Sequence, residues 1–198
     1  LTRFGSGATQ DMVMKGSNHT FINVTFIAFT AVGNPTVDIT PNSTFDFGKH
    51  KFRGCDFYDA GTASTYTFNL DGSITDCYFE GTAASFSQLL QINSGRLVNC
   101  YFASNKAYSN AIVQVAPPAN SNSPEMVVIS GCMFKQYTNA QTRSILVSTA
   151  HGVAVVGCIG DSSSASVGGI TVSTASPGNI TGCNGFSAYT GGTQAGNI

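Results

Sequence analysis

Two acidic side chains have the spacing that acid–base chemistry on a sugar polymer would need. Asp59 and Glu80 lie four and three residues after Cys55 and Cys77, which are two members of a regular repeat. Glycoside hydrolysis uses two carboxyl groups about 5–9.5 Å apart, and similar offsets in stacked repeats can bring residues that close. The sequence therefore predicts Asp59 and Glu80 as the best candidate catalytic pair. Solvated acids that only maintain solubility are the alternative interpretation.

Polar residues recur at one position of the repeat, where the pattern predicts that side chains face outward. The four members are Asp38, Asn69, Gln91 and Gln114, with Val13 before them and Leu146 and Thr171 after them. Tyr78 and Tyr101 follow two successive cysteines and are also expected to face outward, where aromatic rings can stack on sugars. These six residues are the candidate substrate-binding surface. An ordinary solvated sheet face or a contact between subunits is the alternative.

Six cysteines and three histidines raise the question of metal binding or disulfides. There is no CxxC pair, and His19, His50 and His151 have no second ligand at a metal-binding spacing. Cysteines stacked in a sheet would have Cα atoms about 4.8 Å apart, but parallel Cβ vectors do not converge as a disulfide requires. The sequence predicts buried free thiols and neither a metal nor a cofactor.

The elements that position these residues belong to an internal repeat. The repeat is anchored at Val24, Cys55, Cys77, Cys100, Cys132, Cys158 and Cys183, with 22 to 32 residues between successive cysteines. An apolar residue stands three positions before each anchor, and Phe stands two positions after the first five. Both positions are predicted to face a common core.

The residue just before each anchor indicates a sharp bend. These residues are Asn23, Gly54, Asp76, Asn99, Gly131, Gly157 and Gly182. Gly, Asn and Asp are the residues that tolerate the left-handed backbone conformation. A further strand precedes each bend, marked by apolar residues two apart, such as Leu90 and Ile92.

Together these patterns predict an all-β fold: a single-stranded right-handed parallel β-helix, or solenoid, of about seven coils with three short strands each. The whole chain, 1–198, forms one domain in this interpretation. Residues 194–198 resemble residues 166–170, which open the preceding coil. The sequence therefore predicts a chain that stops as another coil begins, as a fragment of a longer solenoid would.

Composition narrows the classes of partner. Lys and Arg number 9 and Asp and Glu number 10 among 198 residues. A protein that neutralises nucleic-acid phosphates needs a basic face, so nucleic acid is not expected as a partner. No apolar run is long enough to cross a bilayer, so membrane insertion is not expected either.

The three-strand coil with an Asn-bearing bend resembles the pectate-lyase-like β-helices, and the Ser/Thr/Asn/Gly-rich, weakly charged sequence is most like phage tailspike and tail-fibre proteins. The resemblance covers residues 12–198. It implies a homotrimer on the virion tail that binds, and often cleaves, bacterial surface polysaccharide. We therefore expect a structural and receptor-binding segment that serves in host attachment.

Two other functions stay open. One is a polysaccharide depolymerase, a hydrolase or a lyase, although no cluster of a basic proton acceptor with cation-binding acids supports a lyase. The other is a secreted or cell-surface bacterial adhesin or stalk solenoid without enzymatic activity. One fold hosts many functions, so the repeat alone does not choose between them.

Overall fold

The protein is an all-β chain whose parallel strands form a nearly closed sheet. The computed structural model describes residues 12–15, 18–28, 37–40, 50–59, 66–81, 87–105, 108–116, 126–137, 143–148, 152–161, 167–172 and 178–198. These ranges contain no helix, and every pairing between their strands is parallel. No helix in this part of the chain is therefore long and apolar enough to span a membrane. The arrangement is compatible with the predicted β-helix.

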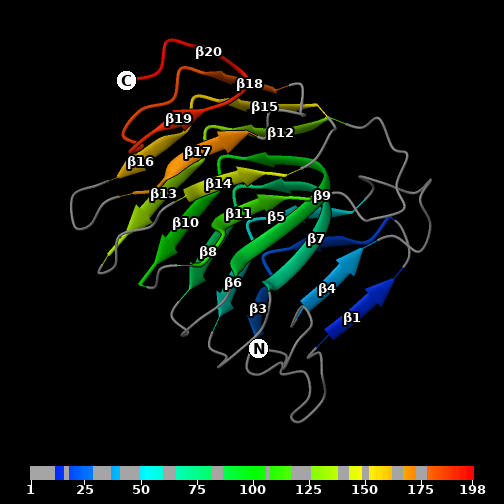
Figure 1. Ribbon diagram of the computed structural model, residues 1–198. Coiled ribbons are helices and arrows are strands. Elements are labelled where there is room, and N and C mark those ends of the chain that lie inside the picture. The colour runs from blue at the N-terminus through cyan, green and yellow to red at the C-terminus, as the bar shows by residue number, and fades with distance from the viewer. Residues whose placement is uncertain are drawn as a thin grey trace.

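The strands fall into three rows, and within a row the strands of successive turns of the chain lie side by side (Figure 1). The first row contains β1 (Met12–Lys15), β4 (Val37–Thr40), β7 (Tyr66–Thr75), β9 (Gln88–Val98), β11 (Ala111–Val115), β14 (Arg143–Val147), β17 (Gly169–Val172) and β19 (Tyr189–Thr190). The second row contains β2 (Thr20–Ile22), β5 (Lys51–Arg53), β12 (Val127–Ser130), β15 (Val153–Val156), β18 (Gly178–Thr181) and β20 (Thr193–Ala195). The third row contains β3 (Thr25–Ala28), β6 (Asp56–Asp59), β8 (Tyr78–Gly81), β10 (Tyr101–Ser104), β13 (Met133–Gln136) and β16 (Ile159–Asp161).

Strands β7 and β9 differ from the predicted pattern because each continues from the first row into the second. Their second halves pair with β5 and β12, so both rows join into one sheet. Each strand turns the corner at a glycine with positive φ, Gly72 (121°) and Gly95 (100°). A Cβ at Gly95 would overlap the carbonyl oxygen of Gly72, so the backbones approach too closely for any side chain.

The predicted bend between the second and third rows is confirmed at every position. The seven residues before the anchors have φ between 52° and 62°, in the left-handed region. Three of the non-glycine residues, Asn23, Asp76 and Asn99, therefore occupy a backbone conformation that most side chains avoid. Asn99 Nδ2 also donates to Asp76 Oδ1 (3.5 Å), so the bends of adjacent coils are linked by side chains.

The core consists of inward columns that follow the predicted register. Phe57, Phe79, Phe102 and Phe134 are fully buried and stack on one another with ring centroids 4.5–4.8 Å apart. Phe26 extends the stack by one coil, 4.8 Å from Phe57. Apolar side chains of the first two rows pack against these rings. The stack buries a large apolar ring in each of five successive coils, which a single coil could not do alone.

The cysteines form a column beside the phenylalanines, and all six are buried free thiols, as predicted. The Cys55 backbone N–H donates to Cys77 Sγ (3.4 Å), and the Cys100 thiol donates to the carbonyl oxygens of Val98 (3.4 Å) and Ile74 (3.5 Å). The hydrogen bond with the Cys77 side chain and burial raise the pKa of Cys55 above its ordinary value. Neutral, enclosed thiols of this kind act as small apolar side chains.

The prediction for the C-terminal residues was wrong in its register. Residues 194–198 do not open a coil, because Gln194 pairs with Ile180 in the second row and Gly196 has the φ of a bend residue (61°). Asn197 then follows where the thiol column would continue. Its Oδ1 accepts the Cys183 N–H (3.0 Å) and its Nδ2 donates to the Ile180 carbonyl (3.1 Å). The resemblance to residues 166–170 was one of composition only.

Candidate functional site

The structure separates the predicted catalytic pair. Asp59 lies in register with Gly81, whereas Glu80 lies in register with Tyr58. Since neighbouring residues of a strand point to opposite faces, Asp59 points into the core and Glu80 points outward. Asp59 is 1% exposed, and Glu80 accepts a hydrogen bond from the Tyr78 hydroxyl (2.8 Å) on the outer face. The prediction that the two carboxylates approach each other was wrong, because their offsets from the cysteine differ by one residue.

Asp59 instead belongs to an interior polar column at the end of the third row. Gly81 and Ser104 follow it in register, and Gln136 follows Ser104. Tyr108 reaches into the space that a side chain at position 81 would fill. Burial, together with the charge of Asp59, raises the pKa of Tyr108 above its ordinary value. The column is enclosed, so it serves the interior of the fold.

The outward polar ladder has the predicted register. Asp38, Asn69, Gln91 and Gln114 are cross-strand partners on β4, β7, β9 and β11. Val13 precedes Asp38, and Leu146 and Thr171 continue the column on β14 and β17. The predicted register is therefore confirmed, but Asp38 and Asn69 are buried, whereas Gln91 and Gln114 are partly exposed.

Hydrogen bonds link this ladder to three polar residues that the sequence analysis did not select. A chain of side-chain hydrogen bonds begins at Asn110 and passes in order through Gln88, Gln91, Asn93 and Asn69. Each side-chain amide donates to the side-chain oxygen of the next residue, and the last one, Asn69, donates to Asp38 Oδ1 (3.1 Å). The four N–H···O distances before the last are 3.4, 3.1, 3.1 and 3.0 Å. We call these six residues the amide chain. Gln114 does not join it and donates to the Ser148 hydroxyl (3.0 Å).

Two simple signals could have found part of this chain. Asn93 stands two residues after Gln91 on the same strand, and residues two apart share a face of a strand. Gln88 and Ala111 are cross-strand partners, so Asn110 lies beside the start of β9. Which amide donates to which acceptor depends on side-chain conformation, which no repeat in the sequence encodes.

The tyrosines form a stack on the outer face of the third row. Tyr78 and Tyr101 are cross-strand partners with ring centroids 5.6 Å apart and planes at 12°, and Tyr58 packs on Tyr78 at 5.8 Å. The faces that Tyr78 and Tyr101 turn towards each other are therefore covered, and the Tyr78 hydroxyl donates to Glu80. Burial and then the hydrogen bond to Glu80 raise the pKa of Tyr78. The predicted sugar-stacking role of Tyr78 and Tyr101 stays a prediction, and it would have to use parts of the rings other than the faces they turn towards each other.

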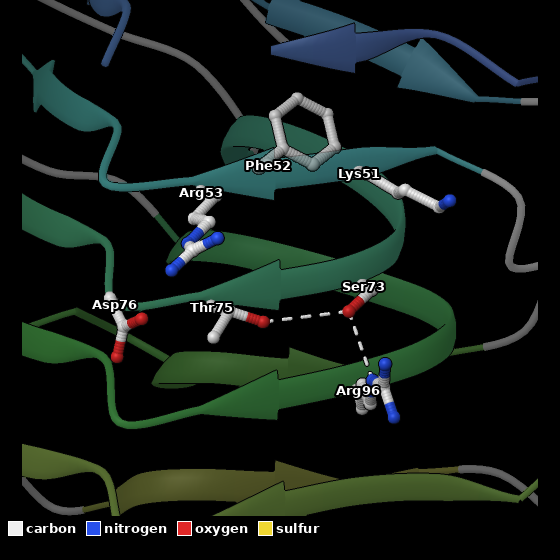
Figure 2. A pocket seen from close by; sticks show the side chains of 7 residues that line it. All are labelled: Lys51, Phe52, Arg53, Ser73, Thr75, Asp76 and Arg96. Carbon is white, nitrogen blue, oxygen red and sulfur yellow. Dashed lines mark hydrogen bonds between the residues drawn. The ribbon is translucent and has the colours of Figure 1, made fainter. Parts of the chain in front are cut away.

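A hollow on the outer face of the second row gathers positive charge. Its cavity volume is about 300 Å³, and it is lined by Lys51, Phe52, Arg53, Ser73, Thr75, Asp76 and Arg96 from β5 and the second halves of β7 and β9 (Figure 2). Lys51, Arg53 and Arg96 are exposed. Arg96 Nε donates to the Ser73 hydroxyl (2.9 Å), which lies 3.5 Å from the Thr75 hydroxyl. We call this cluster the basic hollow; the sequence does not reveal it because Lys51 and Arg53 lie on β5 and Arg96 lies two coils further along the chain, on β9.

Among the described residues, no group of three or more His, Cys, Asp or Glu side chains could hold a metal ion. His19 and His50, which the sequence left scattered, stack with ring centroids 5.1 Å apart at a corner between rows. His151 lies outside the described residues.

The fold and these surfaces define the class: an all-β protein of parallel strands whose outer faces carry a hydrogen-bonded amide chain and a basic hollow. Comparison with protein-family models, with curated proteins and with solved structures finds no match. The function is therefore argued from the site alone.

Proposed function

We propose that this chain is a segment of a right-handed parallel β-helix of about seven coils that binds an extended bacterial surface polysaccharide, as a phage tailspike or tail-fibre segment would. The observation that carries the proposal is the amide chain. Three of its members, Asp38, Asn69 and Gln91, are cross-strand partners at the spacing between strands, about 4.8 Å, and Gln88 and Asn93 extend the chain along β9. Asp38, Asn69 and Gln88 are buried, so a polymer with repeating hydroxyls would meet the chain at its partly exposed members, Gln91, Asn93 and Asn110.

The chemistry of the amide chain favours a neutral, hydrogen-bonding ligand. Each amide offers two N–H donors and an oxygen with two lone pairs, and the chain uses one donor of each and one acceptor of most. The remaining donors and acceptors are held in fixed directions by the hydrogen bonds already made. Gln91 and Asn93 at the centre of the chain are partly exposed, so a ligand can reach them.

The expected affinity of one copy is modest. A net hydrogen bond contributes about 0.5–1.5 kcal/mol, so a few contacts give weak binding to a short sugar. A homotrimer that presents three such faces would bind a long polymer far more tightly through avidity. The proposal therefore includes a homotrimer displayed on a virion tail or, in the adhesin alternative, on a cell surface.

Binding of purified capsular and lipopolysaccharide glycans to the immobilised protein tests the proposal. We expect Gln91→Leu, which removes the central amide at similar volume, to weaken glycan binding by roughly 5–150-fold, the effect of about two lost hydrogen bonds. Gln194→Leu is the matched control, because Gln194 is exposed on β20 in the second row. No glycan binding by the unmodified protein, or equal binding by Gln91→Leu, would refute the proposed site.

The same mixtures of protein and glycan also test the alternative that the protein is a polysaccharide depolymerase. Release of reducing ends or of unsaturated sugars from a bound glycan would indicate a depolymerase. With Asp59 enclosed in the core, Asp59→Asn should then leave that release intact, and the catalytic acids would have to be sought elsewhere.

A further inference from the structure

The basic hollow concentrates charge in a protein that is otherwise close to neutral. Three of its nine basic residues, Lys51, Arg53 and Arg96, line one hollow with a single carboxylate, Asp76. Among the described residues, none of the three forms a salt bridge; the recorded one joins Lys135 to Asp161 on the third row (3.0 Å). Three positive charges around one carboxylate leave an excess of positive charge, so the cluster is complementary to an anion.

The hollow also offers hydrogen-bond donors in a fixed arrangement. The bond from Arg96 Nε to Ser73 orients the guanidinium group and leaves its two terminal nitrogens available. Figure 2 shows the guanidinium group of Arg53 directed towards the strand that carries Thr75, between Arg53 and Arg96. Two guanidinium groups beside two hydroxyls make the type of donor set that binds carboxylate and phosphate oxygens.

We propose that the basic hollow is an oxyanion-binding site that takes a carboxylate or phosphate group. Two sources carry this chemistry: an acidic substituent of the polysaccharide, and a free inorganic anion. The first source rests on the proposed function. It is favoured by continuity, because β7 and β9 carry both surfaces around one corner, and Asn93 of the amide chain lies three residues before Arg96. Three residues of strand span no more than about 11 Å, the scale of one or two sugar units.

Titration with inorganic phosphate and sulfate, followed by NMR signals of the arginine side chains, tests the site without any glycan. We expect saturable shifts for Arg53 and Arg96, and at least a tenfold weaker affinity in Arg53→Gln and in Arg96→Gln. The matched control is Lys135→Gln, which removes one cation from the third row and should leave the affinity unchanged. All three side chains are at the surface, and an unchanged circular-dichroism spectrum shows that each variant is folded.

A second arm compares oligosaccharides that contain uronic acid with neutral ones of equal length. A preference for the acidic series that Arg53→Gln and Arg96→Gln abolish assigns the site to the polysaccharide. Saturable phosphate binding without that preference supports the oxyanion site and assigns it to a free anion. If no glycan binds at all, the proposed function fails while the phosphate titration still decides the oxyanion site.

Three results would overturn the inference. The first is the absence of saturable phosphate or sulfate binding together with equal affinity for acidic and neutral sugars. The second is an equal effect of Lys135→Gln, which would show a general charge effect. The third is tight binding of single-stranded RNA that the same two variants abolish, which would overturn the assignment of the site to a polysaccharide or a free anion.

Discussion

Removal of one ring from the phenylalanine stack should destabilise the protein strongly and locally. Phe79 is fully buried and stacks on Phe57 (4.5 Å) and Phe102 (4.8 Å), so Phe79→Ala empties the centre of the column. Large-to-small substitutions of this kind cost about 3–5 kcal/mol. For a chain of this length the melting temperature should fall by about 6–20 °C. Phe79→Leu, which keeps most of the apolar volume but loses both ring contacts, should cost about 1–3 kcal/mol.

The buried thiols provide a reporter for where the damage occurs. In a solenoid each coil contacts only its neighbours, so the opening of one coil need not expose the others. We expect Cys77, which shares a coil with Phe79, to react about 10²–10⁴ times faster with a thiol reagent in Phe79→Ala, the factor that corresponds to 3–5 kcal/mol. Cys183, several coils away, should react at its original rate.

The measurement is native-state labelling with an alkylating reagent, followed by mass spectrometry of each cysteine-containing peptide. The unmodified protein should label slowly at all six cysteines and completely after denaturation. A destabilisation below about 1 kcal/mol in Phe79→Ala would refute the assigned packing of the column. Equal acceleration at Cys77 and Cys183 would refute the argument that the coils respond locally.

Two further predictions concern backbone geometry and pH. Gly95→Ala should destabilise the protein several-fold more than Gly182→Ala, because a Cβ at Gly95 would meet the backbone of Gly72. At Gly182 a Cβ would face open space, and only the φ of 62° opposes a side chain, at a cost of about 1–2 kcal/mol. Equal denaturation midpoints of the two variants would contradict this prediction. Burial and then the hydrogen bond with Tyr137 raise the pKa of Tyr101 to about 12, so the folded state favours the neutral phenol. The stability that Tyr101 contributes in this way is complete below pH 10 and is lost as the pH rises from about 10 to 12. Tyr101→Phe should therefore lose stability less steeply over that range in denaturation curves, and equal slopes would show that Tyr101 does not titrate as described.

The outer surfaces follow from the same repeat that builds the core. Each coil must place apolar residues inward, but its outward positions are free to vary. The outer faces of the three rows can therefore carry different types of side chain. The amide chain lies on the first row, the basic hollow on the second and the tyrosine stack on the third. A long ligand that crosses the corner at Gly72 and Gly95 would contact the first two surfaces together.

Some site residues could be placed from the sequence because their positions follow the period. The register of Asp38, Asn69, Gln91 and Gln114 is that of the inward residues beside them, which burial fixes strongly, since a slip by one residue would turn every apolar side chain outward. The prediction of Asp59 and Glu80 as a catalytic pair was wrong because the same rule fixes which face each residue points to. Asp59 and Glu80 sit one residue out of step, and in a strand one residue is the difference between core and solvent.

The sequence by itself determined the class of fold, the thiol and phenylalanine columns and the left-handed bends, because burial and backbone sterics act on every coil alike and therefore leave a periodic trace. Only the tertiary structure decided which side chains meet across coils: the direction of the amide chain, the mutual covering of the tyrosine faces and the gathering of Lys51, Arg53 and Arg96 around Ser73. The contacts between coils join residues 20 or more positions apart through particular side-chain conformations. Since such conformations differ from one coil to the next, no period in the sequence records them.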